Sequence, residues 1–223
     1  VAWDLRFPAL DPWTPEEEEN YFGSGGVLVV PGTFTVQMHV REDGTMRALG
    51  EPQSFEVESV RPDPVLPGST QEQRVVFEMQ VAELSRAAAG TDASIGDIVA
   101  ELDAVKATLE RSMTDGSLYE LANSIQQNLK IQRDRIGGNE KRDMYNDPAA
   151  MSVGARLWHA GFVFPVGANG PTPEQRESLR LARALYDDIV SELNTLVNVE
   201  YAGLKEAMDT ARVPWTPGRG IQP

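Results

Sequence analysis

The stretch VVPGTFTVQMHV, from Val29 to Val40, decides the β half of this chain. Pro31 and Gly32 turn the chain, and the residues after them alternate in character. The apolar members of the alternation are Phe34, Val36, Met38 and Val40. Because successive side chains of a strand point to opposite faces, this pattern predicts a half-buried strand with its apolar row turned inward.

The rest of residues 1–60 also has β character. WDLRF, Trp3 to Phe7, alternates apolar with charged residues and predicts a strand that Pro8 ends. EDGT, Glu42 to Thr45, predicts an Asp-Gly turn, and QSFEVESV, Gln53 to Val60, predicts another strand. A complete immunoglobulin-like sandwich needs about seven strands. We therefore expect a partial immunoglobulin-like β-sandwich whose missing strands come from upstream sequence or from another chain.

Residues 61–69, RPDPVLPGS, predict a stiff, proline-rich linker between two domains. After the linker the hydrophobic period becomes helical. Ser69 with Glu72, or Thr70 with Gln73, offers a capping box, and Gly90 is expected to end this first helix. A second helix is predicted from its apolar face, which consists of Ile95, Ile98, Leu102, Val105, Leu109 and Met113.

A third helix is predicted from Ser117, which would form a capping box with Glu120, to Ile136, after which Gly137 and Gly138 end it. The connections near Gly90 and Gly116 are short. We therefore expect these three helices to be antiparallel neighbours.

A long connection, residues 137–172, follows the third helix and contains the apolar run ARLWHAGFVFPVG. Thr172, Pro173 and Gln175 then mark the start of a last helix of about 35 residues, a length near 50 Å if it is unbroken. The predicted fold class is α+β, with the partial sandwich at 1–60, a four-helix bundle at 70–212 and a C-terminal tail at 213–223.

Composition narrows the possible functions. The 34 acidic residues outnumber the 20 basic ones, and the resulting net charge of −14 argues against binding nucleic acid or an anionic membrane. The chain has no cysteine, which removes disulfides and thiolate sites. No apolar run is long enough for a membrane span. The sequence begins at Val1 without Met, so we expect a processed or excised piece.

Several of these motifs together resemble the C-terminal region of bacterial exported proteins that carry a sortilin-like (BNR-repeat) β-propeller. The motifs are WDLRF, VVPGTFTVQMHV, FEVESVRPDP from Phe55 to Pro64, and the late TPEQRESL and LYDDIVSELNTL. The resemblance implies a FlgD-like or fibronectin-like β-domain followed by a helical segment, and an exported location. The propeller's Ser-x-Asp-x-Gly-x-x-Trp repeat is absent, so no propeller chemistry transfers to this chain.

No pattern points to catalysis, a cofactor or a metal. His39 falls on the outward row of the strand, and His159 is expected to pack in the long connection. Glu16 to Glu19 lack the regular ligand spacing of a calcium loop and indicate a solvated charge run. Asp187 and Asp188 are adjacent on a helix and cannot face one another across a substrate. The Glu-x-x-His motif of di-metal bundles is absent.

Trp158, Phe162 and Phe164 are the candidate interaction residues. Exposed aromatics at this density are costly, so we expect them to be covered, either by the chain itself or by a partner. Trp3, Trp13 and Trp215 leave the same two alternatives open.

The predicted function is a non-catalytic, C-terminal spacer and protein-interaction region of an exported propeller protein. The alternative is a carbohydrate-binding or accessory region of a glycosyl-hydrolase-like protein, in which aromatic side chains stack on sugar rings. The expected partner is the segment that completes the β-domain.

Overall fold

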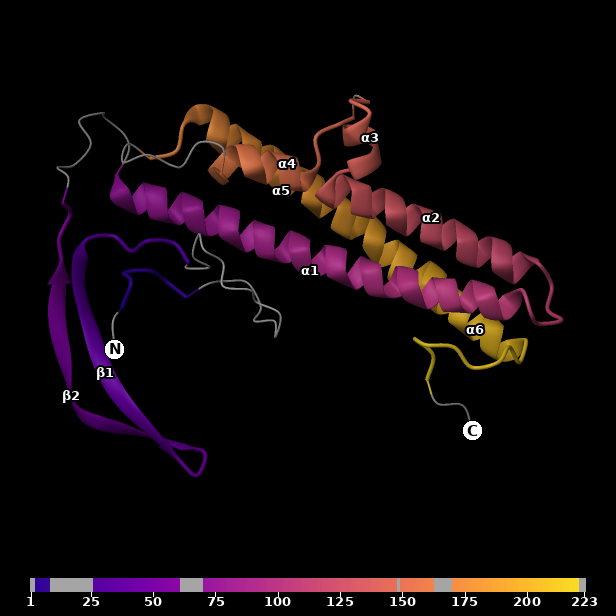
Figure 1. Ribbon diagram of the computed structural model, residues 1–223, viewed down its shortest axis with the longest axis horizontal. Helices are drawn as coiled ribbons and strands as arrows, with labels where there is room; N and C mark the ends of the chain where they lie inside the picture. Colours follow the sequence, from indigo (N-terminus) through magenta and orange to yellow (C-terminus); the bar gives the residue numbers. More distant parts are fainter. Residues whose placement is uncertain (1–2, 9–25, 61–69, 148, 163–169, 221–223) are drawn as a thin grey trace. The chain divides into compact units, whose positions relative to one another are not determined.

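The computed structural model describes residues 3–8, 26–60, 70–147, 149–162 and 170–220. They form an α+β protein with two compact units (Figure 1). The first unit holds the strands and the start of helix α1, as far as Gln80, and the second holds the rest of α1 and the later helices. The predicted linker at 61–69 lies outside the described residues.

The first unit is built on a β-hairpin. Strand β1, Gly32–Glu42, pairs antiparallel with strand β2, Thr45–Val57, and Glu42 lies opposite Thr45. Asp43 and Gly44 between them have φ angles of 47° and 81°, the two positive values of a type I′ turn. The predicted Asp-Gly turn is confirmed.

The hairpin register shifts in its middle. Val36 lies opposite Gln53, but Met38 lies opposite Leu49, so residues 50–52 bulge out of β2. Gly50 takes a φ of 70° there, which favours glycine. The side-chain Nε2 of Gln37 donates to the Gly50 carbonyl at 3.0 Å. This hydrogen bond satisfies a backbone carbonyl at the point where the bulge interrupts the ladder.

The prediction of a strand at Trp3–Phe7 is wrong. Only Arg6 forms a bridge, with Leu28, supported by hydrogen bonds of 2.9 Å from the Phe7 amide to Val27 and from the Val29 amide to Leu5. Leu5 has a φ of 61°, which takes the chain out of the extended course that a strand needs. The described sheet has two strands, so the immunoglobulin-like sandwich is not confirmed.

Helix α1 runs from Gln71 to Leu109 as one 39-residue helix. The Thr70–Gln73 capping box is confirmed by two reciprocal hydrogen bonds of 3.3 Å. The predicted break at Gly90 is wrong. A glycine inside a helix costs about 1 kcal/mol, and the burial of Ala88 and Ile95 on either side offsets that cost.

The second unit, called the helical unit below, is built from long helical segments. Helix α2, Ser117–Gly137, runs antiparallel to α1, as predicted, and Gly138 with a φ of 100° follows its end. Helix α5, Pro173–Thr195, the π-helical segment η2, Leu196–Tyr201, and helix α6, Ala202–Thr210, form one continuous rod. Their hydrogen bonds to α1 show that the rod runs parallel to it. The four-helix bundle is not confirmed, because the first two predicted helices are both α1.

The N-terminus of α2 departs from the predicted capping box. Gly116 occupies the cap position without a side-chain bond, and the carboxylate of Asp115 instead accepts from the Ser117 amide at 3.3 Å. Met113, predicted on the apolar face, lies beyond the end of α1 and is fully exposed.

A buried glutamine joins α1 to α2. Gln126 Nε2 donates to the Val99 carbonyl at 3.1 Å and to the Asp103 carboxylate at 2.7 Å. Its Oε1 accepts from Lys106 Nζ at 2.6 Å. The amide is thus hydrogen-bonded through both its nitrogen and its oxygen, which is what a fully buried polar group requires.

Arg135 joins α2 to α5. Its guanidinium donates to Asp188 and, at 2.9 Å, to Glu192, which also accepts from Gln132 at 2.6 Å. Burial lowers the pKa of Arg135, but the hydrogen bonds to the two carboxylates outweigh it and raise the pKa above its ordinary value.

Residues 213–220, assigned to a tail, pack against the helices. The buried Arg219 guanidinium donates to the Pro214 carbonyl at 2.9 Å, to the Val213 carbonyl at 3.2 Å and to the carboxylate of Asp209. Gly218 lies so close to the Glu101 carboxylate and the Tyr201 hydroxyl that a side chain there would clash.

The long connection contains short helical turns. They are α3, Glu140–Met144, α4, Val153–Leu157, and the π-helical segment η1, Trp158–Phe162. Ser152 caps α4 by accepting from the Ala155 amide at 3.1 Å. Leu157 and Ala160 are buried, so part of this connection belongs to the core.

Leu102→Asp should lower the free energy of unfolding of the helical unit by about 3–5 kcal/mol, because Leu102 has no exposed surface and the new carboxylate would have no partner. Met113→Asp, at a fully exposed position, is the matched control and should change stability by less than about 0.5 kcal/mol. Urea denaturation of both variants measures the difference. Equal stabilities would contradict the position of Leu102 in the core.

Tyr201 predicts a pH dependence. Burial, followed by its 2.5 Å hydrogen bond to Glu101, raises the pKa of Tyr201 above its ordinary value of 10.0. The folded state therefore holds the phenolic proton more tightly than the unfolded state, so this contribution to stability is complete below pH 10.0 and is lost as the pH rises above it. Tyr201→Phe should lower stability at neutral pH by about 1–2 kcal/mol and flatten the loss above pH 10.0. Thermal melts of both proteins between neutral and strongly alkaline pH test this, and parallel curves would contradict it.

Candidate functional site

One face of the β-hairpin is mostly apolar and the other is mostly polar. Cross-strand partners share a face, and the register places Phe34 opposite Phe55 and Met38 opposite Leu49. The apolar row of this face consists of Phe34, Val36, Met38, Val40, Leu49 and Phe55, and Gln53 and Arg47 share the face as the partners of Val36 and Val40. The alternation correctly predicted which β1 residues share a face. It was wrong about their burial, since Val36 is 53% and Met38 64% exposed.

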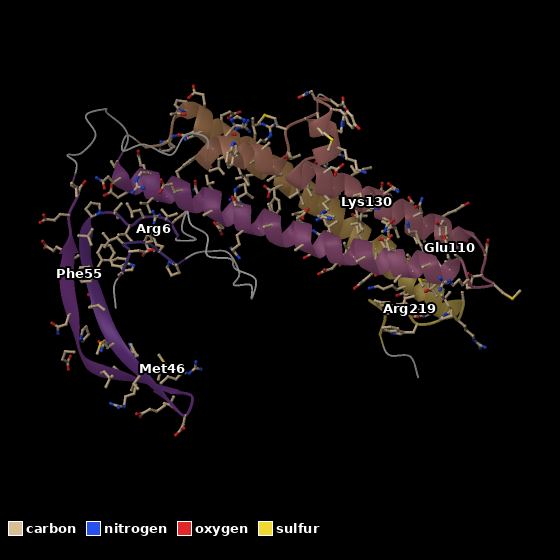
Figure 2. All side chains as sticks on the ribbon, viewed as in Figure 1. Arg6, Met46, Phe55, Glu110, Lys130 and Arg219 are labelled. Atoms are coloured by element: carbon tan, nitrogen blue, oxygen red, sulfur yellow. The ribbon has the colours of Figure 1, made fainter. Side chains whose placement is uncertain are left out.

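An aromatic cluster covers one end of the apolar row. The ring of Trp3 lies 5.2 Å from that of Phe34 and 6.0 Å from that of Phe55, and the two phenylalanine rings are 6.1 Å apart. The two contacts of Trp3 are tilted and edge-on and that between the phenylalanines is stacked, all of which are favoured aromatic geometries. Figure 2 shows Phe55 far from the turn of the hairpin and Met46, on the polar face, close to it. The cluster leaves Val36, Met38 and Leu49 as the open part of the row.

The two edges of the hairpin differ. β2 carries Arg47, Glu51, Pro52 and Glu56, and its bulge interrupts the ladder. Proline, charge and bulges are devices by which natural sheets block unwanted strand pairing. From Gly32 to Val40, β1 has no proline and no Asp, Glu, Lys or Arg. Among the described residues, its only ladder partner is β2. The open edge of β1 and the apolar row beside it together form the candidate interaction surface.

The predicted interaction residues lie in or near η1. Leu157, just before it, is buried, whereas Trp158 is 56% exposed, so the chain leaves most of the indole uncovered. Phe162 ends η1, but its side chain lies outside the described residues, as does all of Phe164. The structure therefore places Trp158 on the surface and does not test its grouping with the two phenylalanines.

The remaining aromatic candidates are also at the surface where they are described. Trp215 is exposed and its Nε1 donates to the Arg219 carbonyl at 3.2 Å. Trp3 belongs to the aromatic cluster of the hairpin. Trp13 and the acidic run at Glu16–Glu19 lie outside the described residues.

The described residues that were weighed for catalysis or metal binding each lie at the surface of their own unit. His39 is exposed on β1, as predicted. His159 is exposed on η1, so the prediction that it packs in the connection is wrong. Asp187 and Asp188 are both on the solvent side of α5, and Asp188 is paired with Arg135. Within the described ranges, no group of His, Asp and Glu residues is arranged to hold a metal ion.

A shallow cavity of about 450 Å³ lies at the start of α5. The sequence did not predict this cavity, because its wall combines residues of α5 with Arg156 from the earlier helix α4. The Ser178 hydroxyl at the wall donates to the Arg156 carbonyl at 2.8 Å. The hydrogen bond from Arg180 lowers the pKa of the neighbouring Glu177. The wall thus presents charges of both signs, and the Ser178 hydroxyl donates to a backbone carbonyl and not to a carboxylate that could activate it as a nucleophile.

Comparison with known proteins adds no relative. No family model matches the chain, and no curated protein and no solved structure matches it either. The resemblance to the C-terminal region of sortilin-like propeller proteins therefore stays a prediction. None of the helices in the described ranges combines the length and the apolar character that a membrane crossing needs.

Trp158→Ala should lower the free energy of unfolding by less than about 1 kcal/mol, because more than half of this side chain is already in water. Leu157→Ala, one residue earlier and buried, should cost about 2–5 kcal/mol. Thermal unfolding of the two variants gives the comparison. A Trp158 variant as unstable as the Leu157 variant would show that the indole is part of the core.

Proposed function

We propose that this chain is a non-catalytic spacer and protein-interaction region in which the β-hairpin is an incomplete β-domain. Strands from another polypeptide segment complete it, as in the partial immunoglobulin-like sandwich that the sequence predicts. The observation that carries this proposal is an edge of β1 with which no described strand pairs, beside an exposed apolar row.

The physical support is the cost of leaving such a surface in water. An isolated two-stranded hairpin is marginally stable, and three or more strands with a buried face are needed for independent stability. A partner that covers the apolar side chains of the row would gain about 25 cal/mol for each Å² of apolar surface that it removes from water. An added strand would bury the flanks of Val36 and Met38 and satisfy the open backbone groups of β1 together.

The helical unit has the properties of a spacer. The bonds of Gln126, Arg135 and Arg219 fasten its segments to one another at several levels. The part of α1 that belongs to this unit, residues 81–109, is about 44 Å long at 1.5 Å per residue. We propose that this unit is a spacer that keeps the parts of the protein joined to its two ends at a fixed distance. The family resemblance implies that the protein is exported.

A photo-cross-linking amino acid at Val36 tests the interaction. In cells that produce the protein, it should link in high yield to one defined extended segment, which mass spectrometry identifies. Val199, 65% exposed on η2, is the matched control and should give only scattered products. Equal, unspecific labelling from both positions would overturn the proposal.

Carbohydrate binding is the second candidate, favoured by the exposure of Trp158 and Trp215 on the helical unit. Exposed indole rings are the usual platforms for stacking, since they offer large apolar faces at little conformational cost. A glycan array probed with the wild type and with Trp158→Ala decides this candidate. Binding that the substitution abolishes would support it, and an array without signal would exclude it for the glycans displayed.

A further inference from the structure

We infer that the strand that docks on β1 is β1 of a second copy of this chain, so that two hairpins form one continuous four-stranded antiparallel sheet. This inference rests on the proposed function, because it names the polypeptide that completes the β-domain. It follows from three properties of β1, which are its charge, its symmetry and the direction of its free backbone groups.

The charge of β1 differs from that of the chain around it. The protein has a net charge of −14, so two copies repel each other over most of their surfaces. β1 carries no Asp, Glu, Lys or Arg between Gly32 and Val40. In an antiparallel self-pair a charged residue near the centre of the strand would lie close to its own copy, and a strand with a neutral centre avoids this cost. β2, with Glu51, Pro52 and Glu56, lacks this property.

The side chains of β1 are compatible with two-fold symmetry. Its 11 residues are centred on Gln37, so full antiparallel overlap places Gln37 opposite its own copy. Val36 then lies opposite Met38 of the second copy, and Phe34 lies opposite Val40. Apolar and aromatic residues therefore meet on one face. The charged residues of the pairing lie at its ends, where Arg41 is opposite Thr33 on the other face and Glu42 is opposite Gly32.

The backbone of β1 fits the same register. A two-residue turn makes Glu42 and Thr45 a hydrogen-bonded pair, so the amide and carbonyl groups of Glu42 point toward β2. Those of Arg41, His39 and Gln37 alternate with it and point away from β2. In the symmetric pairing these outward-pointing residues oppose one another, with His39 opposite Thr35. They can therefore exchange the hydrogen bonds of a regular antiparallel ladder.

Two charge variants test the pairing without disturbing the hairpin, because Val36 and Met38 are both more than half exposed. One variant carries Val36→Lys with Met38→Lys, and the other carries Val36→Glu with Met38→Glu. In the self-pair of either variant, position 36 of each copy faces position 38 of the other, so two pairs of like charges meet. Light scattering after size exclusion should show a dimer for the wild type and a monomer for each variant. Mixing the two variants should restore the dimer, since every Lys then faces a Glu.

Met46→Lys is the matched control, because Met46 is 60% exposed on β2 and lies outside the inferred pairing. It should remain dimeric, and circular dichroism should show that every variant is folded. A monomeric wild type, a variant pair that fails to associate on mixing, or loss of the dimer in Met46→Lys would each overturn the inference. The cross-link from Val36 separates the two proposals. A link to a different polypeptide would overturn self-pairing and leave the proposed function standing.

Discussion

The buried side-chain amide of Gln126 is the constraint on which the helical unit depends. Its nitrogen donates to a backbone carbonyl of α1 and to Asp103, and its oxygen accepts from Lys106. A slip of α2 along α1 by one turn would leave these groups buried without partners, at a cost of about 1–3 kcal/mol each. Apolar side chains alone tolerate such slips, whereas a hydrogen-bonded amide does not. The hydrogen bonds from Arg135 to Asp188 and Glu192 then fix the position of α5 along the axis of α2.

The elements most accurately predicted from the sequence are those governed by local geometry. The Asp43–Gly44 turn, the Thr70–Gln73 cap, the end of α2 at Gly137 and the start of α5 at Pro173 depend on residues within one turn of each other. The failures involve contacts between residues far apart in the chain. Gly90 is a residue type that often ends a helix, but the hydroxyl of Thr91, the next residue, lies 2.8 Å from that of Tyr186, which is 95 residues after Thr91.

The interaction surface could be predicted in part. Alternation shows which β1 residues share a face, because side-chain direction in a strand depends only on period two. It cannot show whether that face is covered, since cover comes from other elements. The bulge at residues 50–52 was not foreseen either, although Gly50 and Pro52 are the residue types that mark one. Trp158 illustrates the same limit, because its neighbour Leu157 has the same apolar character and is buried.

The distant contacts of the C-terminal residues have a consequence for synthesis of the protein. The Gln126 bonds join residues 20–27 positions apart, so α1 and α2 can associate while the chain is still emerging from the ribosome. The bond from Tyr201 to Glu101 spans 100 residues, and the Gly218 contact with Glu101 spans more. The side of α1 that receives these residues must therefore wait for nearly the whole of this sequence to be translated. During that interval the nascent helical pair exposes apolar surface, which makes it a natural client for a chaperone that binds unfinished chains.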